Sequence, residues 1–280
     1  MRLIDFDEKF QHYLRDWYEA RRREMTVEQM ELRIPQLYEE WLEAPADWLG
    51  GTAPGAYFLD REPGELVEWM LAYMAARVGI PGPLQDAVAD GDTADLLKAL
   101  VFETAALPPG ADRDTVRMQA MGLLLEMDNG FTLDELLSLA AGRVKREDEL
   151  ADTAAEGLLA FGQAAVEPVL AAMDGPVSDW ARISLADVLT NYPGDARITR
   201  WLMRLYREHP EHRTLFAAYL GKYGDPAALP LLEEEIRDLT LGYFDYLEVK
   251  NAIEALGGRV ETEREFAYDE DYETLSKEEK

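Results

Sequence analysis

The sequence contains no cysteine among its 280 residues. This absence excludes disulfide bonds, thiolate nucleophiles and thiolate metal ligands, and it suits a protein of the reducing cytosol. Histidine is scarce as well, with three residues in the chain. Two of them lie in the segment 208–212 beside two glutamates, a set that is able to bind a metal ion. Pro210 prevents the four side chains from sharing a helical face, so we predict no metal site and no cofactor.

Basic residues are few, because 28 lysines and arginines stand against 56 aspartates and glutamates. The resulting formal charge of −28 repels the phosphates of nucleic acids and favours partners of the opposite sign. The one basic cluster that we note is Arg15, Arg21, Arg22, Arg23 and Arg33, for which nearby glutamates are the expected partners. We therefore expect no nucleic-acid partner.

Long apolar runs and familiar catalytic motifs are also lacking. No stretch approaches the roughly 18 uninterrupted apolar residues of a membrane span. The first eight residues carry acid where a signal peptide needs base and an apolar core. The sequence has no glycine-rich phosphate loop, no HExxH motif and no GxSxG motif. These absences predict a cytoplasmic protein that is not an enzyme and does not bind a membrane.

Helical periodicity is present throughout, and no alternating β-branched run indicates a strand, so the fold class is all-α. The aromatic-rich segment Phe6–Arg23 predicts a first helix, and Thr26 with Gln29 forms a capping box that opens a second. Pro45–Pro63 follows as an irregular loop whose aromatics are expected to tuck against these helices, with a binding loop as the alternative. We assign residues 1–63 to this N-terminal helical cap and loop.

A repeat organises the second half of the chain, from Leu158 to Leu256. Gly162 and Gly224 each end a helix, and Pro168 and Pro230 each lie in the first turn of the next. Both pairs are 62 residues apart (224−162; 230−168). This period fits two helical hairpins rather than one, which predicts a degenerate copy halfway between them.

The apolar stripe of the second helices sets their register. Ala181, Leu185, Val188 and Leu189 recur at steps of four, three and one, as on a helix packed on one side. The helix-end leucines at 189, 220 and 256 are separated by 31 and 36 residues (220−189; 256−220). We expect the five additional residues to form an insertion around 242–246.

These glycine, turn and proline-bearing helix patterns resemble HEAT and HEAT-like (armadillo-type) repeats. Asp174 and Arg182 match the aspartate and arginine of that family, whereas Arg213 and Lys250 occupy the arginine position in later copies. The resemblance implies a right-handed α-α superhelix, or solenoid, of antiparallel helix pairs over residues 64–258. Residues 259–280 would follow as a solvated acidic C-terminal tail, in which we reject a calcium loop at 269–273 because its glycine and final glutamate are missing.

The resemblance also implies that the second helices line the concave side of the stack. The non-core stripe of the best-defined second helix is Trp180, Ser184, Asp187 and Asn191. Steps of 31 and 36 residues lead from it to equivalent positions in later copies. The predicted protein-binding residues are Trp180, Asp187, Asn191, Lys222, Asn251 and Glu254. The alternative for Trp180 is that it only packs under the neighbouring repeat.

HEAT-like arrays act mostly as protein-binding scaffolds, so the resemblance implies an adaptor whose acidic concave surface binds a protein partner of basic character. The first alternative is a HEAT-like enzyme, such as the bilin lyases, that holds a bulky ligand in the groove. The second is nucleic-acid binding similar to that of the HEAT-like alkylpurine DNA glycosylases.

Overall fold

The computed structural model describes residues 2–127, 130–260, 264–266, 269 and 272. Every regular element in this part of the chain is helical, with fifteen α-helices, five short 3-10 helices and no strand. The all-α fold class is therefore confirmed. No helix of the described part is both long and apolar enough to cross a membrane. The chain forms two compact units, Met1–Thr132 and Leu133–Lys280, here called unit 1 and unit 2. The predicted boundaries at 63 and 258 stay predictions.

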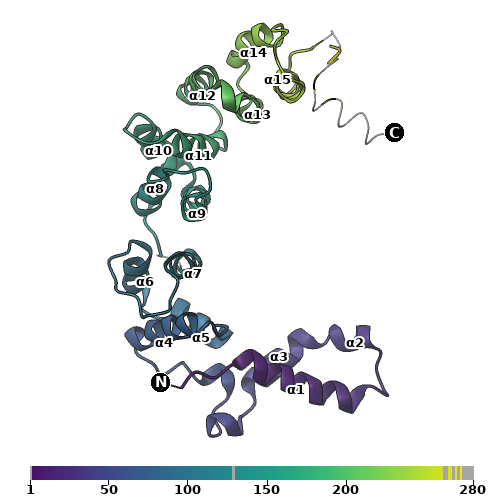
Figure 1. Cartoon of the computed structure of the whole chain (residues 1–280), viewed down its shortest axis with the longest axis vertical. Coiled ribbons are helices and arrows are strands. Elements are labelled where there is room, and N and C mark those ends of the chain that lie inside the picture. The colour runs from purple at the N-terminus through teal and green to yellow at the C-terminus, as the bar shows by residue number, and fades with distance from the viewer. Residues whose placement is uncertain (1, 128–129, 261–263, 267–268, 270–271, 273–280) are drawn as a thin grey trace. The chain divides into compact units, whose positions relative to one another are not determined.

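Unit 1 holds the first seven α-helices, drawn from purple to teal in Figure 1. Within it α1 packs on α3, α4 on α5 and α6 on α7. The helices are α1 (Phe6–Arg21), α2 (Val27–Glu31), α3 (Ile34–Glu43), α4 (Pro63–Ala76), α5 (Gly82–Asp90), α6 (Ala94–Val101) and α7 (Arg113–Glu126). The predicted capping box opens α2, since the Thr26 hydroxyl accepts from the Gln29 amide while the Gln29 side chain accepts from the Thr26 amide.

The aromatic residues of the loop between α3 and α4 pack against the start of α1, as expected. Phe58 is fully buried, and its ring centroid lies 5.8 Å from that of Phe6. Trp48 meets the same ring edge-on at 5.4 Å, and Tyr57 lies 6.1 Å from it. Because Phe58 is buried and Trp48 and Tyr57 are half-buried against the helices, the packing interpretation of this loop is confirmed.

Apolar residues continue the helical pattern to Ala106, so the sequence predicts a longer helix. In the structure, α6 ends earlier than this pattern suggests. The chain leaves the helix at Val101, and Glu103 adopts a φ of 58°, which a helix cannot contain. The Glu103 carboxylate pairs with Arg113 and, at 2.8 Å, with Arg117 of α7. The end of α6 is thus accompanied by an ion pair between Glu103 and α7.

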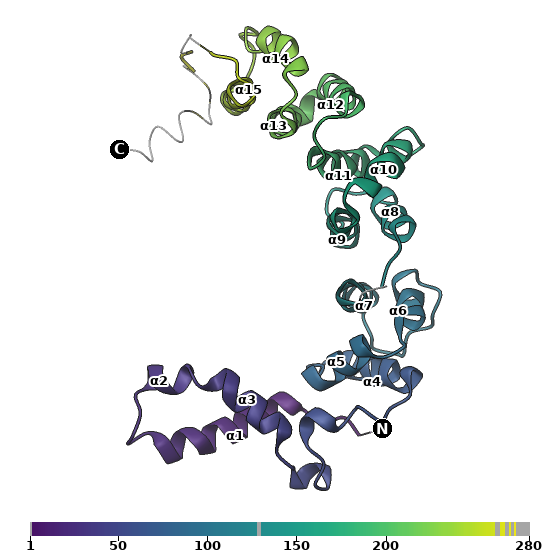
Figure 2. The same cartoon turned by 180° about the vertical axis from the view of Figure 1, so that it is seen from behind.

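Unit 2 holds the remaining eight α-helices in two rows (Figures 1 and 2). We call α8 (Leu133–Ala141), α10 (Val166–Met173), α12 (Ala196–Glu208) and α14 (Leu229–Glu235) the first-helix row. The second-helix row is α9 (Glu149–Leu158), α11 (Asp179–Thr190), α13 (Arg213–Tyr223) and α15 (Tyr243–Ala255). Each helix of the second row packs on the next helix of that row, and each also packs on the first-row helix that precedes it in the chain.

The glycines and prolines on which the predicted repeat rests lie at the ends and in the first turns of helices. Gly162 has φ 57° and ψ −141°, a conformation that side chains with a Cβ avoid, and it separates α9 from α10. Gly224 has φ 78° and caps α13 in the left-handed region. Pro168 and Pro230 both lie in the first turn of a first-row helix, α10 and α14. The segment in which the halfway copy is expected contains the helices α12 and α13.

The core of unit 2 follows the predicted register. All four residues of the apolar stripe on α11 are buried, and none is more than 4% exposed. The equivalent buried residues on α13 are Phe216, Ala217, Leu220 and Tyr223, and on α15 they are Tyr246, Val249, Ala252 and Ile253. Because each stripe faces the neighbouring helices, the second-helix row has one buried side and one side with polar residues.

Two expectations for the end of the chain are corrected. The additional residues precede α15, in 236–242, and the segment 243–246 forms the first turn of that helix rather than an insertion. The tail is not wholly solvated, because Phe266 is only 6% exposed and packs with Leu241 and Tyr246. The rejected calcium loop at 269–273 lies mostly outside the described residues.

Candidate functional site

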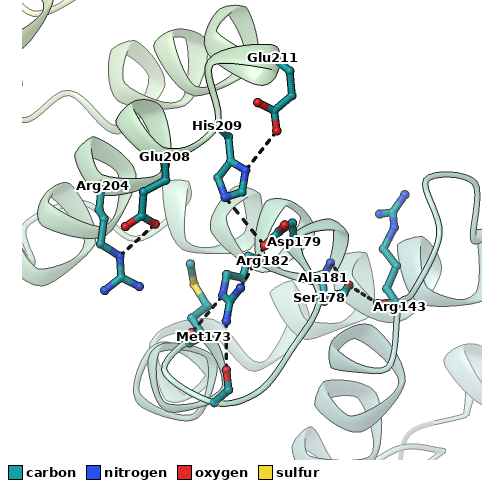
Figure 3. A network of polar contacts seen from close by, with 11 residues as sticks. Arg143, Met173, Ser178, Asp179, Ala181, Arg182, Arg204, Glu208, His209 and Glu211 are labelled. Carbon is teal, nitrogen blue, oxygen red and sulfur yellow. Dashed lines mark hydrogen bonds and ion pairs between the residues drawn. The ribbon is translucent and has the colours of Figure 1, made fainter.

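A buried arginine joins the linker between α8 and α9 to helix α11. Arg143 is 8% exposed, and its guanidinium donates to the carboxylate of Asp152 and to the hydroxyl of Ser184. Its backbone carbonyl accepts from the hydroxyl of Ser178, the residue that caps the start of α11 (Figure 3). Because a buried charge requires such partners, this cluster fixes α9 and α11 against each other.

Beside Arg143 a cavity of about 210 Å³ opens along the second-helix row. The residues that line it come mainly from α9 and α11, with Tyr219 from α13. Its polar lining consists of Arg143, Asp152, Glu156, Ser184, Asp187, Asn191 and Tyr219. Burial, and to a lesser extent the charge of Asp187, raises the pKa of Tyr219. The tyrosine hydroxyl therefore stays neutral at physiological pH and is able to exchange hydrogen bonds with a ligand.

Three of the six predicted binding residues meet in or beside this cavity. The ammonium of Lys222 lies 3.0 Å from Oδ1 of Asp187, and both side chains are about half exposed. The Asn191 amide donates to the backbone carbonyls of Asp187, at 3.0 Å, and Val188, at 3.1 Å, which leaves its carbonyl oxygen as an acceptor. An exposed ion pair of this kind contributes little to stability. Lys222 can therefore move away from Asp187 at small cost.

The other three predicted residues lie elsewhere in unit 2. Trp180 is half-buried at the start of α11, and its ring centroid is 5.1 Å from that of His212 in the linker between α12 and α13. It thus packs on the following helix pair, which fits the alternative interpretation of this residue. Asn251 and Glu254 are exposed on α15 and are not part of the cavity lining.

The start of α11 carries a second polar network (Figure 3). Arg182 donates to the carbonyl of Met173 at 3.5 Å and to that of Gly175 at 3.2 Å, and so caps the end of α10. Its other partner is Asp179, at 3.1 Å, which also lies 3.9 Å from Nε2 of His209. Arg213, at the equivalent position of the next pair, instead contacts Glu235 of α14 at 3.2 Å. This arginine role is therefore not repeated.

The histidine segment pairs with acids rather than gathering around one point. Nδ1 of His209 lies 3.3 Å from Glu211, while His212 turns toward Trp180. In the part of the chain that the structure describes, no three histidine, aspartate or glutamate side chains are grouped so that they could hold a metal ion.

Sequence reasoning missed Glu156, Arg143 and Tyr219 as members of the cavity. Glu156 had a usable signal, since it lies 31 residues before Asp187, the same step that separates Leu189 from Leu220 (187−156; 220−189). Arg143 had none, because it lies in a linker among other charged residues and only the tertiary structure buries it.

Comparison with known proteins identifies no similar protein. No protein-family model, curated protein or solved structure matches the chain.

Proposed function

We propose that unit 2 is a HEAT-like stack of antiparallel helix pairs that binds a protein partner of basic character on its second-helix row. The contact of each second-row helix with the next supports the stack. In a right-handed superhelix this row would line the concave side. The proposal is of a scaffold, and it assigns no chemical reaction to the chain.

The observation that carries the proposal is a stripe of carboxylates at the repeat step. Glu156 on α9, Asp187 on α11 and Glu254 on α15 are separated by 31 and 67 residues (187−156; 254−187), and 67 is the sum of the 31- and 36-residue steps. None of the three is buried. Equivalent positions on stacked helices face the same side, so these carboxylates form one acidic surface.

The charges of this surface are available to a partner. The side-chain carboxylates of Glu156 and Glu254 make no hydrogen bond or ion pair with any residue that the structure describes. Asp187 has the exposed Lys222 as its partner. Each new ion pair with a lysine or arginine would contribute little by itself. Several pairs along one row, together with the net charge of −28, would accelerate the encounter with a basic surface.

The size of the cavity on this row does not favour the lyase alternative. Sites for bulky small molecules occupy about 300 to 1,000 Å³ and are mostly apolar. The cavity beside Arg143 has about 210 Å³ and a lining in which charged and polar side chains are prominent. A single aromatic residue, Tyr219, belongs to it.

The test is capture of partners from the native cytosol by three forms of the full-length protein. The site variant carries Glu156→Lys and Glu254→Lys. The matched control carries Glu233→Lys and Glu234→Lys on α14, two exposed glutamates of the first-helix row, so the change in net charge is identical. We expect a protein that the wild type and the control retain and the site variant loses.

Retention of the same proteins by all three forms would exclude the second-helix row as the binding surface. Equal loss from both variants would instead assign the capture to net charge alone. Thermal unfolding of each form checks that the variants remain folded.

A further inference from the structure

Helix α12 is basic, in contrast to the acidic chain as a whole. It contains Arg197, Arg200, Arg204 and Arg207 and a single acid, Glu208, whereas the whole chain has twice as many acidic as basic residues. The four arginines recur at steps of three, four and three residues, so they lie along one helical stripe. Sequence reasoning named a different cluster, at 15–33, as the only basic one and missed this stripe.

A cavity of about 440 Å³ lies between α10 and α12, in the first-helix row. Helix α12 contributes Arg197, Arg200, Trp201 and Arg204, and helix α10 with the residue after it contributes Glu167, Leu170, Ala171 and Asp174. The volume falls within the range of ligand-binding pockets. This cavity shares no lining residue with the one beside Arg143.

The guanidinium of Arg197 is already paired with carboxylates of unit 2. Its guanidinium donates to Glu167 of α10, with one contact at 3.0 Å, and to Asp195, with contacts of 2.6 to 3.1 Å. Hydrogen bonds from Arg197 lower the pKa of both carboxyls. Because its donors are occupied, Arg197 holds α12 against α10 and is not available to a ligand.

The side chains of Arg200 and Arg204 are paired less fully than that of Arg197. The Arg200 side chain is exposed and makes no hydrogen bond or ion pair with any described residue, although its charge helps to lower the pKa of Asp195. The guanidinium of Arg204 lies 3.5 Å from the centroid of the Trp201 ring, and its contact with Glu208, at 3.6 Å, is too long for a hydrogen bond (Figure 3). Stacking on an aromatic face leaves the N–H edge of a guanidinium free to donate. Arg200 therefore offers unused donors to the cavity, and Arg204 offers those donors that its ion pair with Glu208 does not engage.

We propose that this cavity, which we call the Arg200–Arg204 cavity, binds a carboxylate-rich segment of a second protein. The guanidinium fork fits a carboxylate with two parallel hydrogen bonds, and residues four apart on a helix are about 5 to 6 Å apart at Cβ. Two acidic side chains of one peptide match that spacing. Leu170, Ala171 and Trp201 supply apolar contact for the side-chain stems. A free ion would use neither the volume nor these apolar atoms.

This inference goes beyond the proposed function, since it concerns the other row of helices and a partner of the opposite charge. The probe is a fluorescein-labelled decaglutamate peptide, titrated with the full-length protein and followed by fluorescence anisotropy. Physiological salt, with a screening length of about 8 Å, limits the repulsion from the acidic remainder of the chain.

The decisive comparison is between Arg200→Glu and Arg207→Glu. Both residues are exposed on α12, neither has a hydrogen bond or ion pair with a described residue, and only Arg200 lines the cavity. We expect saturable binding to the wild type, weakened by about tenfold or more in Arg200→Glu and by less than about twofold in Arg207→Glu. If Arg200→Glu does not fold, Arg200→Gln takes its place, with an expected weakening of about threefold.

Absence of saturable binding, or an equal loss in the two variants, would overturn the proposal. Inorganic phosphate that binds as tightly as the peptide and is lost in Arg200→Glu would reassign the cavity to a free anion. A wild-type dimer that Arg200→Glu dissociates in sedimentation would reassign it to a second copy of this chain. Either result also overturns the peptide proposal.

Discussion

Two arginines of unit 2 illustrate how surroundings decide the role of a residue type. Arg143 is almost fully buried and has a carboxylate, a hydroxyl and backbone carbonyls as partners. Arg200 is exposed and has none among the described residues. A buried charge that loses its partners is destabilising, whereas an exposed unpaired charge contributes little to stability. The first arginine therefore serves the fold, and the second is free for binding.

Replacement of Arg143 should destabilise the protein strongly. Arg143→Met removes the donors that satisfy Asp152 and Ser184 and should lower the free energy of unfolding by about 3 kcal/mol. The control, Arg207→Met, removes an exposed side chain and should change it by less than about 0.5 kcal/mol. Urea titrations followed by circular dichroism compare the two. Equal midpoints would contradict the role assigned to Arg143.

The contact between α12 and the turn before α14 should make stability depend on pH. The buried hydroxyl of Thr199 donates to Asp225, and the Ala227 amide donates to the same carboxylate at 3.0 Å. These bonds lower the pKa of Asp225 below its ordinary value of 3.8. A lowered carboxyl pKa stabilises the fold fully above the unfolded pKa, and this contribution is lost as the pH falls through the folded pKa.

Thr199→Val removes the larger of these two interactions. The variant should lose about 1 kcal/mol of unfolding free energy at pH 7. Its difference from the wild type should then shrink as the pH falls below 3.8, because the carboxylate that Thr199 stabilises becomes protonated in both forms. Urea titrations at several pH values measure the difference. A difference that stays constant down to pH 2 would be the contrary result.

At the residue scale, the positions of the cavity residues could be predicted from the sequence better than their roles could. Asp187 and Asn191 were reachable because the apolar stripe of α11 defines the side on which they lie. Glu156 was one repeat step away. Whether an arginine is buried like Arg143 or unpaired like Arg200 depends on neighbours from other helices, and no local pattern contains that information.

At the scale of elements, the contact between α13 and α15 depends on a glycine. A Cβ at Gly221 would lie 3.0 Å from Cα and 3.3 Å from Cβ of Ala252, so the two helices approach closely at this point. Gly122 in α7 is also helical, and a Cβ there would meet no atom within 4 Å. The two glycines therefore form a matched pair for substitution.

Gly221→Leu should force α13 and α15 apart and lower the free energy of unfolding by about 2 kcal/mol. Gly122→Leu should raise it by about 0.5 to 1 kcal/mol, because leucine is the better helix former and has room. Thermal unfolding of both variants gives the sign directly. Stabilisation by both would show that α13 and α15 are not in close contact.

The contact of the C-terminal segment with α15 makes a second test at this scale. Phe266 is 6% exposed, with its ring centroid 5.1 Å from those of Tyr243 and Tyr246. Phe266→Ala should lower the free energy of unfolding by about 3 kcal/mol. Phe244 lies on the same turn of α15 as Tyr243 and Tyr246 but is 47% exposed. The control Phe244→Ala should therefore lower the free energy of unfolding by less than about 1 kcal/mol. Equal costs in urea titrations would mean that residue 266 does not pack on α15.

Element boundaries could be predicted where a local signal defines them, and not elsewhere. Thr26, Gly224 and Pro230 mark helix ends through capping and φ, which are properties of the residues themselves. The end of α6 coincides with the left-handed Glu103, which pairs with α7, and the packing of Phe266 depends on rings from α15. Both involve partners that are distant in the sequence.

At the scale of the whole molecule, the chain has a net charge of −28, and the charged residues of unit 2 are not evenly distributed. The second-helix row carries the stripe of Glu156, Asp187 and Glu254, while α12 in the first-helix row carries four arginines. The acidic stripe and the arginine stripe therefore lie on different rows, although the first-helix row also carries exposed acids such as Glu233 and Glu234 of α14. The two proposals therefore concern different rows of unit 2: a basic partner on the second-helix row and an acidic segment at α12.

The 62-residue period predicted helices in unit 2 because it places a glycine at a helix end and a proline in the first turn of the next helix. Unit 1 has no such period, so its helices were predicted singly from their apolar stripes. The division of the chain after Thr132 was not predicted, because no change of composition marks it.

The most direct test of the central claim is the association rate constant of the captured basic partner, measured by stopped flow at low and high salt. For the wild type and the Glu233→Lys/Glu234→Lys control, it should fall by about tenfold or more between about 0.05 and 0.3 M salt. The Glu156→Lys/Glu254→Lys variant should associate more slowly at low salt and depend less on it. A rate that is indifferent to salt and equal in all three forms would contradict an acidic binding surface on the second-helix row.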